Sequence, residues 1–132
     1  MATQHKFRAN DHDLVLTYLL DAATAVDRNV FVAHRPYQLI SIEEAHGTAS
    51  SSGTLDLEKC TGTTAPGSGT SMCTGTLNLA GTANTTVAGT PSATVANTKL
   101  ADGDRLAFDF GGTVTNLVGA VVTIVLRPLD VK

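Results

Sequence analysis

The sequence predicts an all-β protein, built as an antiparallel β-sandwich or jelly-roll-like barrel, and two observations carry this prediction. First, short segments of alternating apolar and polar residues recur along the chain between clusters of turn residues, as in sandwiches and barrels. Second, charged residues make up only 16% of the chain, against about 25% in an ordinary soluble domain. Threonine and valine, which favour half-buried pleated surfaces, are abundant instead.

The length of 132 residues corresponds to one domain, which can bury a sizeable core without metals or disulfides. Residues 1–13 are polar and of mixed charge, and we interpret them as an extended N-terminal arm. Residues 14–132 are then a single β domain, because no linker or repeat of fixed period divides them.

Residues 14–20, LVLTYLL, begin this domain and admit two interpretations. A helical stripe through Leu16, Leu19 and Ala23, capped by Asp13, is one of them. The apolar run stops after seven residues, however, and includes the strand formers Val, Thr and Tyr. Because helices are usually longer than such a run, we favour a strand.

The other strand candidates are separated by turn sequences such as LAGTAN and LADGD. They cover residues 30–33, 37–45, 54–60, 71–79, 85–89, 105–110 and 117–129. Since side chains alternate between the two faces of a strand, the residues expected to share an apolar face are Leu55 and Leu57, and Leu106, Phe108 and Phe110.

The closing segment, residues 117–129, is apolar on both faces. One face would carry Val118, Ala120, Val122, Ile124 and Leu126, and the other Leu117, Val121 and Val125. A strand that is apolar on both faces must be covered on both. We expect a second copy of the chain to cover Leu117, Val121 and Val125, which predicts a homo-oligomer; coverage by the chain's own loops is the alternative.

Residues 59–73, KCTGTTAPGSGTSMC, look most like a functional loop. A phosphate-binding P-loop would need a Lys and a Ser or Thr after its second Gly, followed by a helix. Here Thr70 and Ser71 follow Gly69, and a strand candidate comes next, so we interpret the segment as a hairpin tip. Cys60 and Cys73 could then lie opposite one another and form a disulfide in an oxidising medium. Reduced thiols are the alternative and are the norm in a cytoplasm.

Composition argues against several classes of partner. The net charge of −3 provides no field to hold a nucleic acid backbone, and an aromatic content of 5% without Trp gives few stacking platforms. No apolar run approaches the roughly 20 residues that span a bilayer, and residues 1–13 lack the apolar region of a secretory signal. We therefore expect no nucleic acid or membrane partner, and synthesis in a cytoplasm without general export.

Two short segments combine His with carboxylates, DHD at 11–13 and EEAH at 43–46, but neither has a known metal-ligand spacing. Glu43 and Glu44 are neighbours in a strand, so they point to opposite faces and cannot act as a carboxylate pair. We interpret both segments as solvated charge. No Ser lies in a GxSxG elbow either. The sequence thus predicts no metal, no cofactor and no enzymatic activity.

Three segments together resemble a known family: residues 27–49, residues 54–70 with the tip GTTAPGSGT, and residues 99–129 with a GDRL turn and the closing strand VTIVLRPL. They are similar in style to the head-decoration (cement) proteins of tailed bacteriophages, which have a jelly-roll-like β fold. The resemblance implies a non-enzymatic virion protein, made in the bacterial cytoplasm, that binds the outer surface of the capsid and stabilises the head. It also implies a trimer, whose partners are copies of itself and the major capsid protein.

Within this interpretation we expect the N-terminal arm to contact the capsid. Phe7 would be an apolar anchor, and Lys6 and Arg8 would pair with acidic groups. Ordering an arm costs about 1–2 kcal/mol of backbone entropy per residue, and three arms on one trimer would offset this cost through avidity.

Two other functions compete with this one. A receptor-binding or glycan-binding β-sandwich head of a phage head or tail fibre would need an exposed cluster of aromatic residues. A metal-dependent, cupin-like enzyme would need ligand spacings that the sequence lacks.

Overall fold

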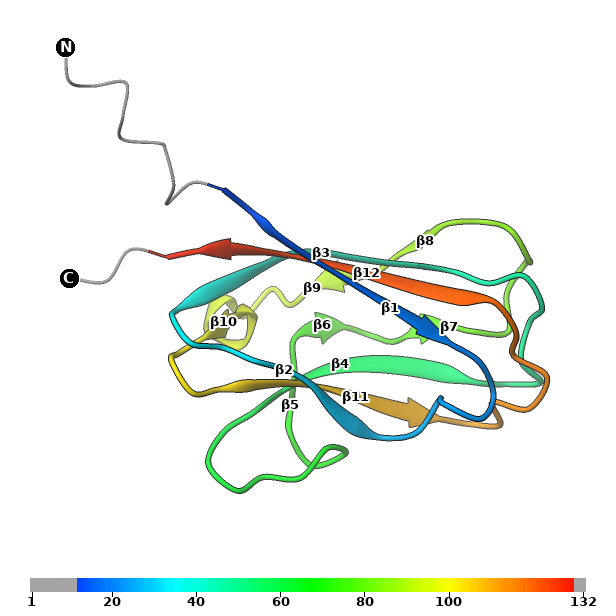
Figure 1. Ribbon diagram of the computed structural model, residues 1–132, viewed down its shortest axis with the longest axis horizontal. Coiled ribbons are helices and arrows are strands. Elements are labelled where there is room, and N and C mark those ends of the chain that lie inside the picture. Colours follow the sequence, from blue (N-terminus) through cyan, green and yellow to red (C-terminus); the bar gives the residue numbers. More distant parts are fainter. Residues whose placement is uncertain (1–11, 130–132) are drawn as a thin grey trace, which may run out of the picture.

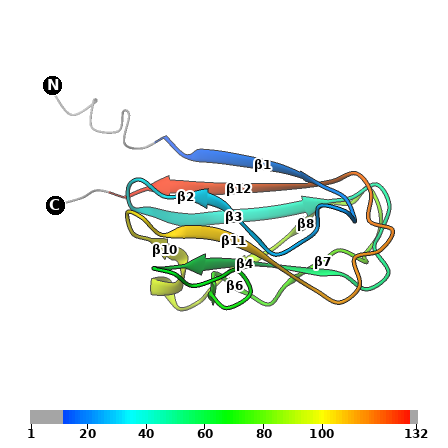
Figure 2. The ribbon, with the colours of Figure 1, turned by 60° about the horizontal axis from the view of Figure 1, so that its bottom comes forward.

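The computed structural model describes residues 12–129, which fold into two antiparallel β-sheets packed face to face (Figure 1, Figure 2). The all-β sandwich predicted from the sequence is confirmed. Sheet A has the order β1–β12–β3–β10, and β8 also pairs with β3. Its strands are β1 (Leu14–Leu20), β12 (Ala120–Pro128), β3 (Tyr37–Ala45), β10 (Lys99–Leu100) and β8 (Val87–Ala88).

Sheet B has the order β2–β11–β4–β5, and β7 also pairs with β4. Its strands are β2 (Arg28–Val32), β11 (Arg105–Gly111), β4 (Thr54–Cys60), β5 (Thr70–Ser71) and β7 (Leu77–Asn78). A small additional sheet pairs β6 (Cys73–Thr74) with β9 (Thr90–Pro91), and a 3-10 helix covers Val95–Thr98. Within the described residues, no helix has the length and apolar character needed to cross a membrane.

The chain winds alternately between the two sheets, which is the jelly-roll arrangement. β1 and β3 belong to sheet A, whereas β2 and β4 belong to sheet B. On the return path, β11 inserts between β2 and β4, and β12 inserts between β1 and β3. The first and last long strands are therefore neighbours, and β12 lies inside its sheet rather than at an edge.

The core lies between the two sheets, and the alternation predicted for β4 and β11 is confirmed. Leu55, Leu57, Leu106 and Phe108 are buried, and Phe110 packs against them in a half-buried position. Their partners from sheet A include Leu39, Ile42, Val122, Ile124 and Leu126.

Residues 14–20 form a strand rather than the alternative helix, because all seven pair with β12, and Tyr18 fixes this strand to the other sheet. It lies in β1, its ring packs edge-to-face on Phe108 with centroids 5.3 Å apart, and its hydroxyl donates a hydrogen bond to the Val30 carbonyl at 2.7 Å. β1 of sheet A is thereby tied to β2 and β11 of sheet B. In the strand, Tyr18 lies on the inner face, where its ring contacts Phe108 and its hydroxyl reaches the Val30 carbonyl.

The single strand predicted over residues 71–79 is wrong, because this stretch is divided among three pairings. β5 pairs with β4, β6 pairs with β9, and β7 returns to β4. Gly75, between β6 and β7, has a backbone φ of +78°, which only Gly adopts readily. The chain turns there, and the strand cannot continue.

A bulge in sheet A moves one side chain of β3 across the sheet. Regular alternation would put Leu39 and Ile42 on opposite faces, yet both are buried in the core. The β3–β12 register shifts between Val125 and Leu126, which pair with Ser41 and Leu39. Ile40 is therefore the extra residue, and the strand places core side chains on both sides of it.

The predicted faces of residues 117–119 are wrong. Leu117 is 0% exposed within its own chain, whereas Val118 is exposed to solvent. The reason is that β12 begins only at Ala120, and Gly119 before it has a φ of +65° that breaks the alternation. From Ala120 onward the prediction is confirmed, with Ala120, Val122, Ile124 and Leu126 buried.

Candidate functional site

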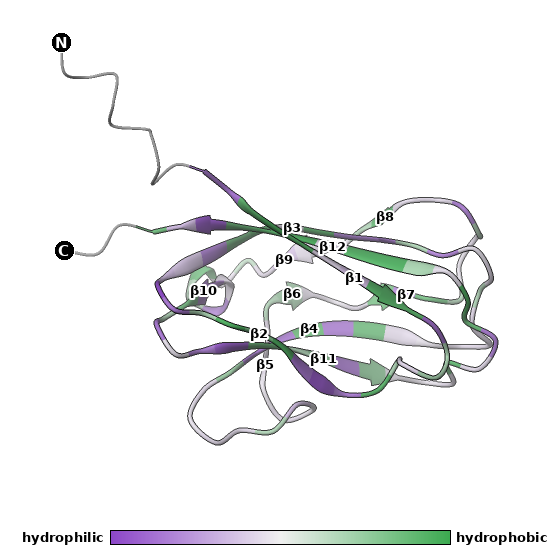
Figure 3. Cartoon of the chain, viewed as in Figure 1, coloured by the Kyte–Doolittle hydropathy of each residue, from purple (hydrophilic) through white to green (hydrophobic). Residues whose placement is uncertain are grey.

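The outer face of sheet A carries an apolar surface across β1 and β12, which we call the β1–β12 patch. It consists of Val15, Leu19, Val121 and Val125, with Thr17 and Thr123 between the two apolar pairs. The register places Val15 directly opposite Val125 and Leu19 opposite Val121. Leu19 is 78% exposed and Val15 is 58% exposed, so no described loop covers β1 on this side. Figure 3 shows the hydrophobic stretches along both strands.

Polar groups bound this patch at one end and along one side. At the end, Arg127 donates to both oxygens of Asp13 at 3.0 and 3.2 Å. This hydrogen bond holds the pKa of Asp13 below its usual value. Along the side, β3 contributes Ser41 and Glu43, which lie opposite Val125 and Thr123 of β12. The patch is therefore apolar at its centre and bounded by polar groups at one end and along β3, and contact surfaces commonly have such polar borders.

A shallow hollow of about 150 Å³ lies next to the patch on the same face of sheet A. Its lining comes from β3, β12 and the loop before β8, and consists of Glu43, Glu44, Ala45, Thr86, Val121 and Thr123. Val121 belongs to both the hollow and the patch. A protruding side chain of a partner would fit here beside the flat apolar surface.

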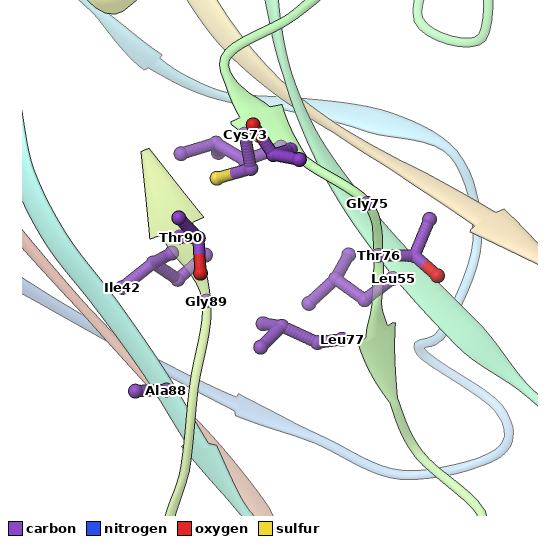
Figure 4. Close-up of a pocket in the computed structure, with 11 residues that line it drawn as sticks. Ile42, Leu55, Cys73, Gly75, Thr76, Leu77, Ala88, Gly89 and Thr90 are labelled. Carbon is purple, nitrogen blue, oxygen red and sulfur yellow. The ribbon is translucent and has the colours of Figure 1, made fainter. Parts of the chain in front are cut away.

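A second cavity, of about 120 Å³, lies between the sheets near the small strands β6 to β9. Figure 4 shows Ile42, Leu55 and Leu77 converging on it from three strands, with the Cys73 side chain beside them. Thr74, Thr76 and Thr90 line it as well, so the cavity is of mixed polarity, and its volume would hold a few water molecules. Gly89 lines it as well, and a Cβ built there would lie 2.8 Å from Cγ2 of Ile42.

The two thiols do not form the disulfide considered from the sequence. Cys60 and Cys73 are both free. The β4–β5 register pairs Lys59 with Thr70, so Cys60 lies beside Gly69 rather than beside Cys73. The hairpin tip itself is confirmed, but its return strand begins three residues before Cys73 and then leaves for another pairing.

Neither thiol is activated. Burial raises the pKa of Cys73 to about 11, with a further contribution from the charge of Asp56. Burial also raises the pKa of Cys60, which is fully enclosed. Because the thiolate is the reactive form, both cysteines behave as packing residues at neutral pH.

Three carboxylates gather on the outer face of sheet B. Oxygen atoms of Asp56, Glu58 and Asp109 all lie within 4.8 Å of one another. The hairpin tip folds over them, because the backbone N–H groups of Gly67 and Gly69 donate to Oε1 of Glu58 at 2.9 and 3.2 Å.

The carboxylates in this group repel one another. Burial raises the pKa of Asp109, and the neighbouring charges of Glu58 and Asp27 raise it further. Burial also raises the pKa of Asp56, although a hydrogen bond from the Ser71 hydroxyl at 2.7 Å acts against this. Carboxylates at this spacing are the donors that a hard divalent cation prefers. Among residues 12–129, hydrogen bonds from Gly67 and Gly69 hold Glu58, and one from Ser71 of β5 holds Asp56.

The EEAH segment differs from its prediction as solvated charge. Glu43 and Glu44 do point to opposite faces, and Glu43 is exposed, but Glu44 and His46 are both buried at the end of β3. His46 contacts the Glu44 carboxylate and the Gly81 carbonyl, each at 2.9 Å. This pair fastens the loop after β7 to β3 and is a structural element of the sandwich.

The structure therefore separates the residues predicted as site residues. Val121 and Val125 lie half-buried on the outer face, and their place in a subunit interface stays a prediction. Leu117 lies in the core and is unavailable to a partner. The arm candidates Lys6, Phe7 and Arg8 lie outside the described residues. Asp13, assigned from the sequence to the arm, is held against β12 by Arg127.

Sequence reasoning missed the contribution of β1 to the surface. Val15 and Leu19 alternate with Leu14, Leu16 and Tyr18, and this period-two pattern was available in the sequence. The pattern does not identify the partner strand, because the pairing of β1 with β12 joins residues that are a hundred or more positions apart.

The comparisons with known proteins leave the family open. No protein-family model matches the chain, and no curated protein matches it. Among solved structures, the chain is similar to one described in the study "Bacillus endospore appendages form a novel family of disulfide-linked pili". The two are 13% identical, the alignment covers 91% of this chain and 88% of the other, and the TM-score is 0.43.

Proposed function

We propose that this protein is a non-enzymatic structural component that associates with copies of itself and binds the outer surface of a tailed-phage capsid, which it reinforces. The observation that carries the proposal is the β1–β12 patch. A solvent-exposed sheet face that carries apolar side chains and hydroxyl groups is suited to binding the surface of another protein.

The energetics favour covering this face. Burial of apolar surface stabilises by about 25 cal/mol per Å², and Leu19 and Val15 are still largely exposed in the single chain. Thr17 and Thr123, which separate the apolar pairs, carry no charge that would have to be desolvated. Covering Val121, Val125 and their β1 neighbours with another protein surface therefore gains apolar burial at small polar cost.

Attachment to a capsid rests on the family resemblance and on the composition of the arm. Lys6 and Arg8 would pair with acidic groups of the major capsid protein, and Phe7 would be buried between them. In an oligomer, several such arms engage at once, and each bound arm raises the effective concentration of the others.

A catalytic function has little support in the groups that could carry it. Burial keeps the thiol of Cys73 protonated. Both ring nitrogens of His46 are occupied by hydrogen bonds within the chain, to Glu44 and to the Gly81 carbonyl. A glycan-binding head is also disfavoured. In residues 12–129 the aromatic side chains are all buried or half-buried, and none of them forms an exposed platform.

Capsid binding can be tested with capsids of the phage that encodes the chain, expanded and assembled without this protein. We expect the full chain to bind saturably and to raise the temperature at which the capsids open. A chain of residues 12–132 keeps the ion pair of Asp13 with Arg127, so it should fold as before but bind weakly. Equal binding by the two chains would contradict the role of the arm, and no binding by either would contradict the capsid function.

A further inference from the structure

β1 is an edge strand whose outer side has no partner in the described part of the chain. It pairs with β12 on one side, and it is the terminal strand of sheet A. Among residues 12–129, no loop donates or accepts a backbone hydrogen bond along its other side. Alternate N–H and C=O groups of β1 therefore face outward, which makes the strand a template for adding another strand.

The protections that proteins place on such edges are missing from β1. Its seven residues, LVLTYLL, contain no charge, no Pro and no Gly, and their register with β12 is unbroken. Natural edges are usually interrupted, short or charged. The opposite edge of sheet A ends in the two-residue strands β10 and β8, and the edge strand β2 carries Arg28 and a register shift against β11.

We propose that β1 of a second copy adds to this edge in antiparallel orientation, so that the two A sheets become one continuous sheet across a twofold axis. This rests on the self-association in the proposed function and gives it a twofold geometry in place of the trimer that the family resemblance implies. It does not depend on binding to a capsid. A single contact of this kind closes two identical open edges at once.

The side chains of β1 are self-complementary in this arrangement. Pairing centred on Thr17 places Val15 opposite Leu19 of the second copy, and Leu19 opposite its Val15. These side chains lie on the outer face, so the two β1–β12 patches merge into one apolar surface of twice the extent. The same register brings Asp13 near Asp21 of the second copy, and the ion pair of Asp13 with Arg127 offsets their repulsion.

The arm of this chain is a poorer occupant of the edge than a second β1. Residues 4–11, QHKFRAND, carry Lys6, Arg8 and Asp11, whereas the strand they would join is uncharged. Charged residues are what natural edges use to prevent pairing. The β1 sequence, in contrast, has strand-forming residues throughout and matches itself in length.

Thr17→Cys tests the proposal, with Thr123→Cys as the matched control. Thr17 and Thr123 are direct neighbours on the outer face, but only Thr17 lies on the edge strand. Under mild oxidation of the full chain, we expect Thr17→Cys to move into a disulfide-linked dimer band, and Thr123→Cys to stay at the wild-type background. Equal cross-linking of both variants would mean that copies stack face to face, and it would overturn the proposal.

Hydrogen exchange of the wild-type chain provides a second measurement that needs no substitution. We expect every second amide of β1 to exchange more slowly as protein concentration rises, and β2 amides to be unaffected. Absence of both cross-linking and this protection would overturn the proposal. A chain of residues 12–132 retains every described core residue. If the protection of β1 disappears in that chain, the arm and not a second β1 occupies the edge, and the proposal is overturned.

Discussion

Nδ1 of His46 lies 2.9 Å from Oε2 of Glu44, and both side chains are buried. Nε2 of His46 lies 2.9 Å from the Gly81 carbonyl, which can only accept, so Nε2 must carry a proton. The contact between Nδ1 and Oε2 then holds one shared proton, on the imidazole or on the carboxyl. In the described residues, the other oxygen of Glu44 is buried without a hydrogen-bond partner.

This pair predicts that stability falls as pH rises. Burial raises the pKa of Glu44. Burial lowers the pKa of His46, but the hydrogen bonds to Gly81 and Glu44 outweigh this and leave it raised. A raised pKa in the folded state means that the folded protein binds protons more tightly than the unfolded chain. The stabilisation is complete below the unfolded pKa values and is lost as pH rises through the folded ones.

Glu44→Gln isolates this effect. The Gln amide can donate to Nδ1 of a neutral imidazole, so the variant keeps the hydrogen bond and loses the titration of the carboxyl and its effect on the imidazole. We expect the free energy of unfolding of the wild type to decline relative to Glu44→Gln as pH increases, in urea unfolding across the neutral range. Glu43→Gln, the exposed neighbour, is the control. A constant difference between wild type and Glu44→Gln at all pH values would contradict the shared proton.

Asp109 is a site where removing a charge should stabilise the protein. It lies directly opposite Asp56 on the neighbouring strand, and like charges in that position are destabilising. Because its pKa is raised by burial and by Glu58 and Asp27, the cost is absent at low pH and appears as pH rises through that pKa. Asp109→Asn should therefore raise the free energy of unfolding by about 0.2–1 kcal/mol near neutral pH.

The measurement is chemical unfolding in a buffer with a chelator, at neutral pH and again at a pH where carboxylates are protonated. Asp102→Asn, in the exposed turn before β11, is the control. A loss of stability in Asp109→Asn would show that this carboxylate has a favourable partner, and the repulsion argued here would be the wrong description.

The thiol of Cys73 should react slowly despite its position on a cavity wall. Its pKa of about 11 leaves little thiolate near neutral pH, and Cys60 is more deeply buried. We expect alkylation by iodoacetamide, followed by mass spectrometry, to be much slower in the folded protein than in urea, with Cys60 the slower of the two. Fast labelling of Cys73, or an oxidised link between Cys60 and Cys73 in the folded protein, would contradict this geometry.

The parts of the fold that the sequence predicted correctly are those determined by local alternation. β1 and β4 have the predicted bounds, and Leu55, Leu57 and Phe108 face inward as expected, because a strand with one buried face shows its period directly. The errors lie where the backbone departs from that period. Gly119 reverses the faces of Leu117 and Val118, and this depends on a φ value that the sequence does not report.

The candidate surface could be predicted only in part for a related reason. Val121 and Val125 were identified because β12 is apolar on both faces, but a patch requires knowing which strand lies beside them. That neighbour, β1, is far away in sequence. In the same way, the sequence alone indicates solvated charge for Glu44 and His46. Their burial depends on the loop that contains Gly81, which is distant in sequence. Which residues are buried depends on long-range strand pairing, and the alternation of residues along one strand does not determine that pairing.

The β1–β12 patch makes a final prediction with a closely matched control. Val15→Thr and Val32→Thr change the same side chain at sites that are 58% and 59% exposed, but Val32 lies on β2 of sheet B. Neither change should alter the stability of the single chain by more than about 0.5 kcal/mol. In sedimentation velocity over a dilution series, we expect Val15→Thr to dissociate at higher protein concentration than wild type, and Val32→Thr to match it. If the two variants weaken association equally, the patch is not the surface through which copies meet.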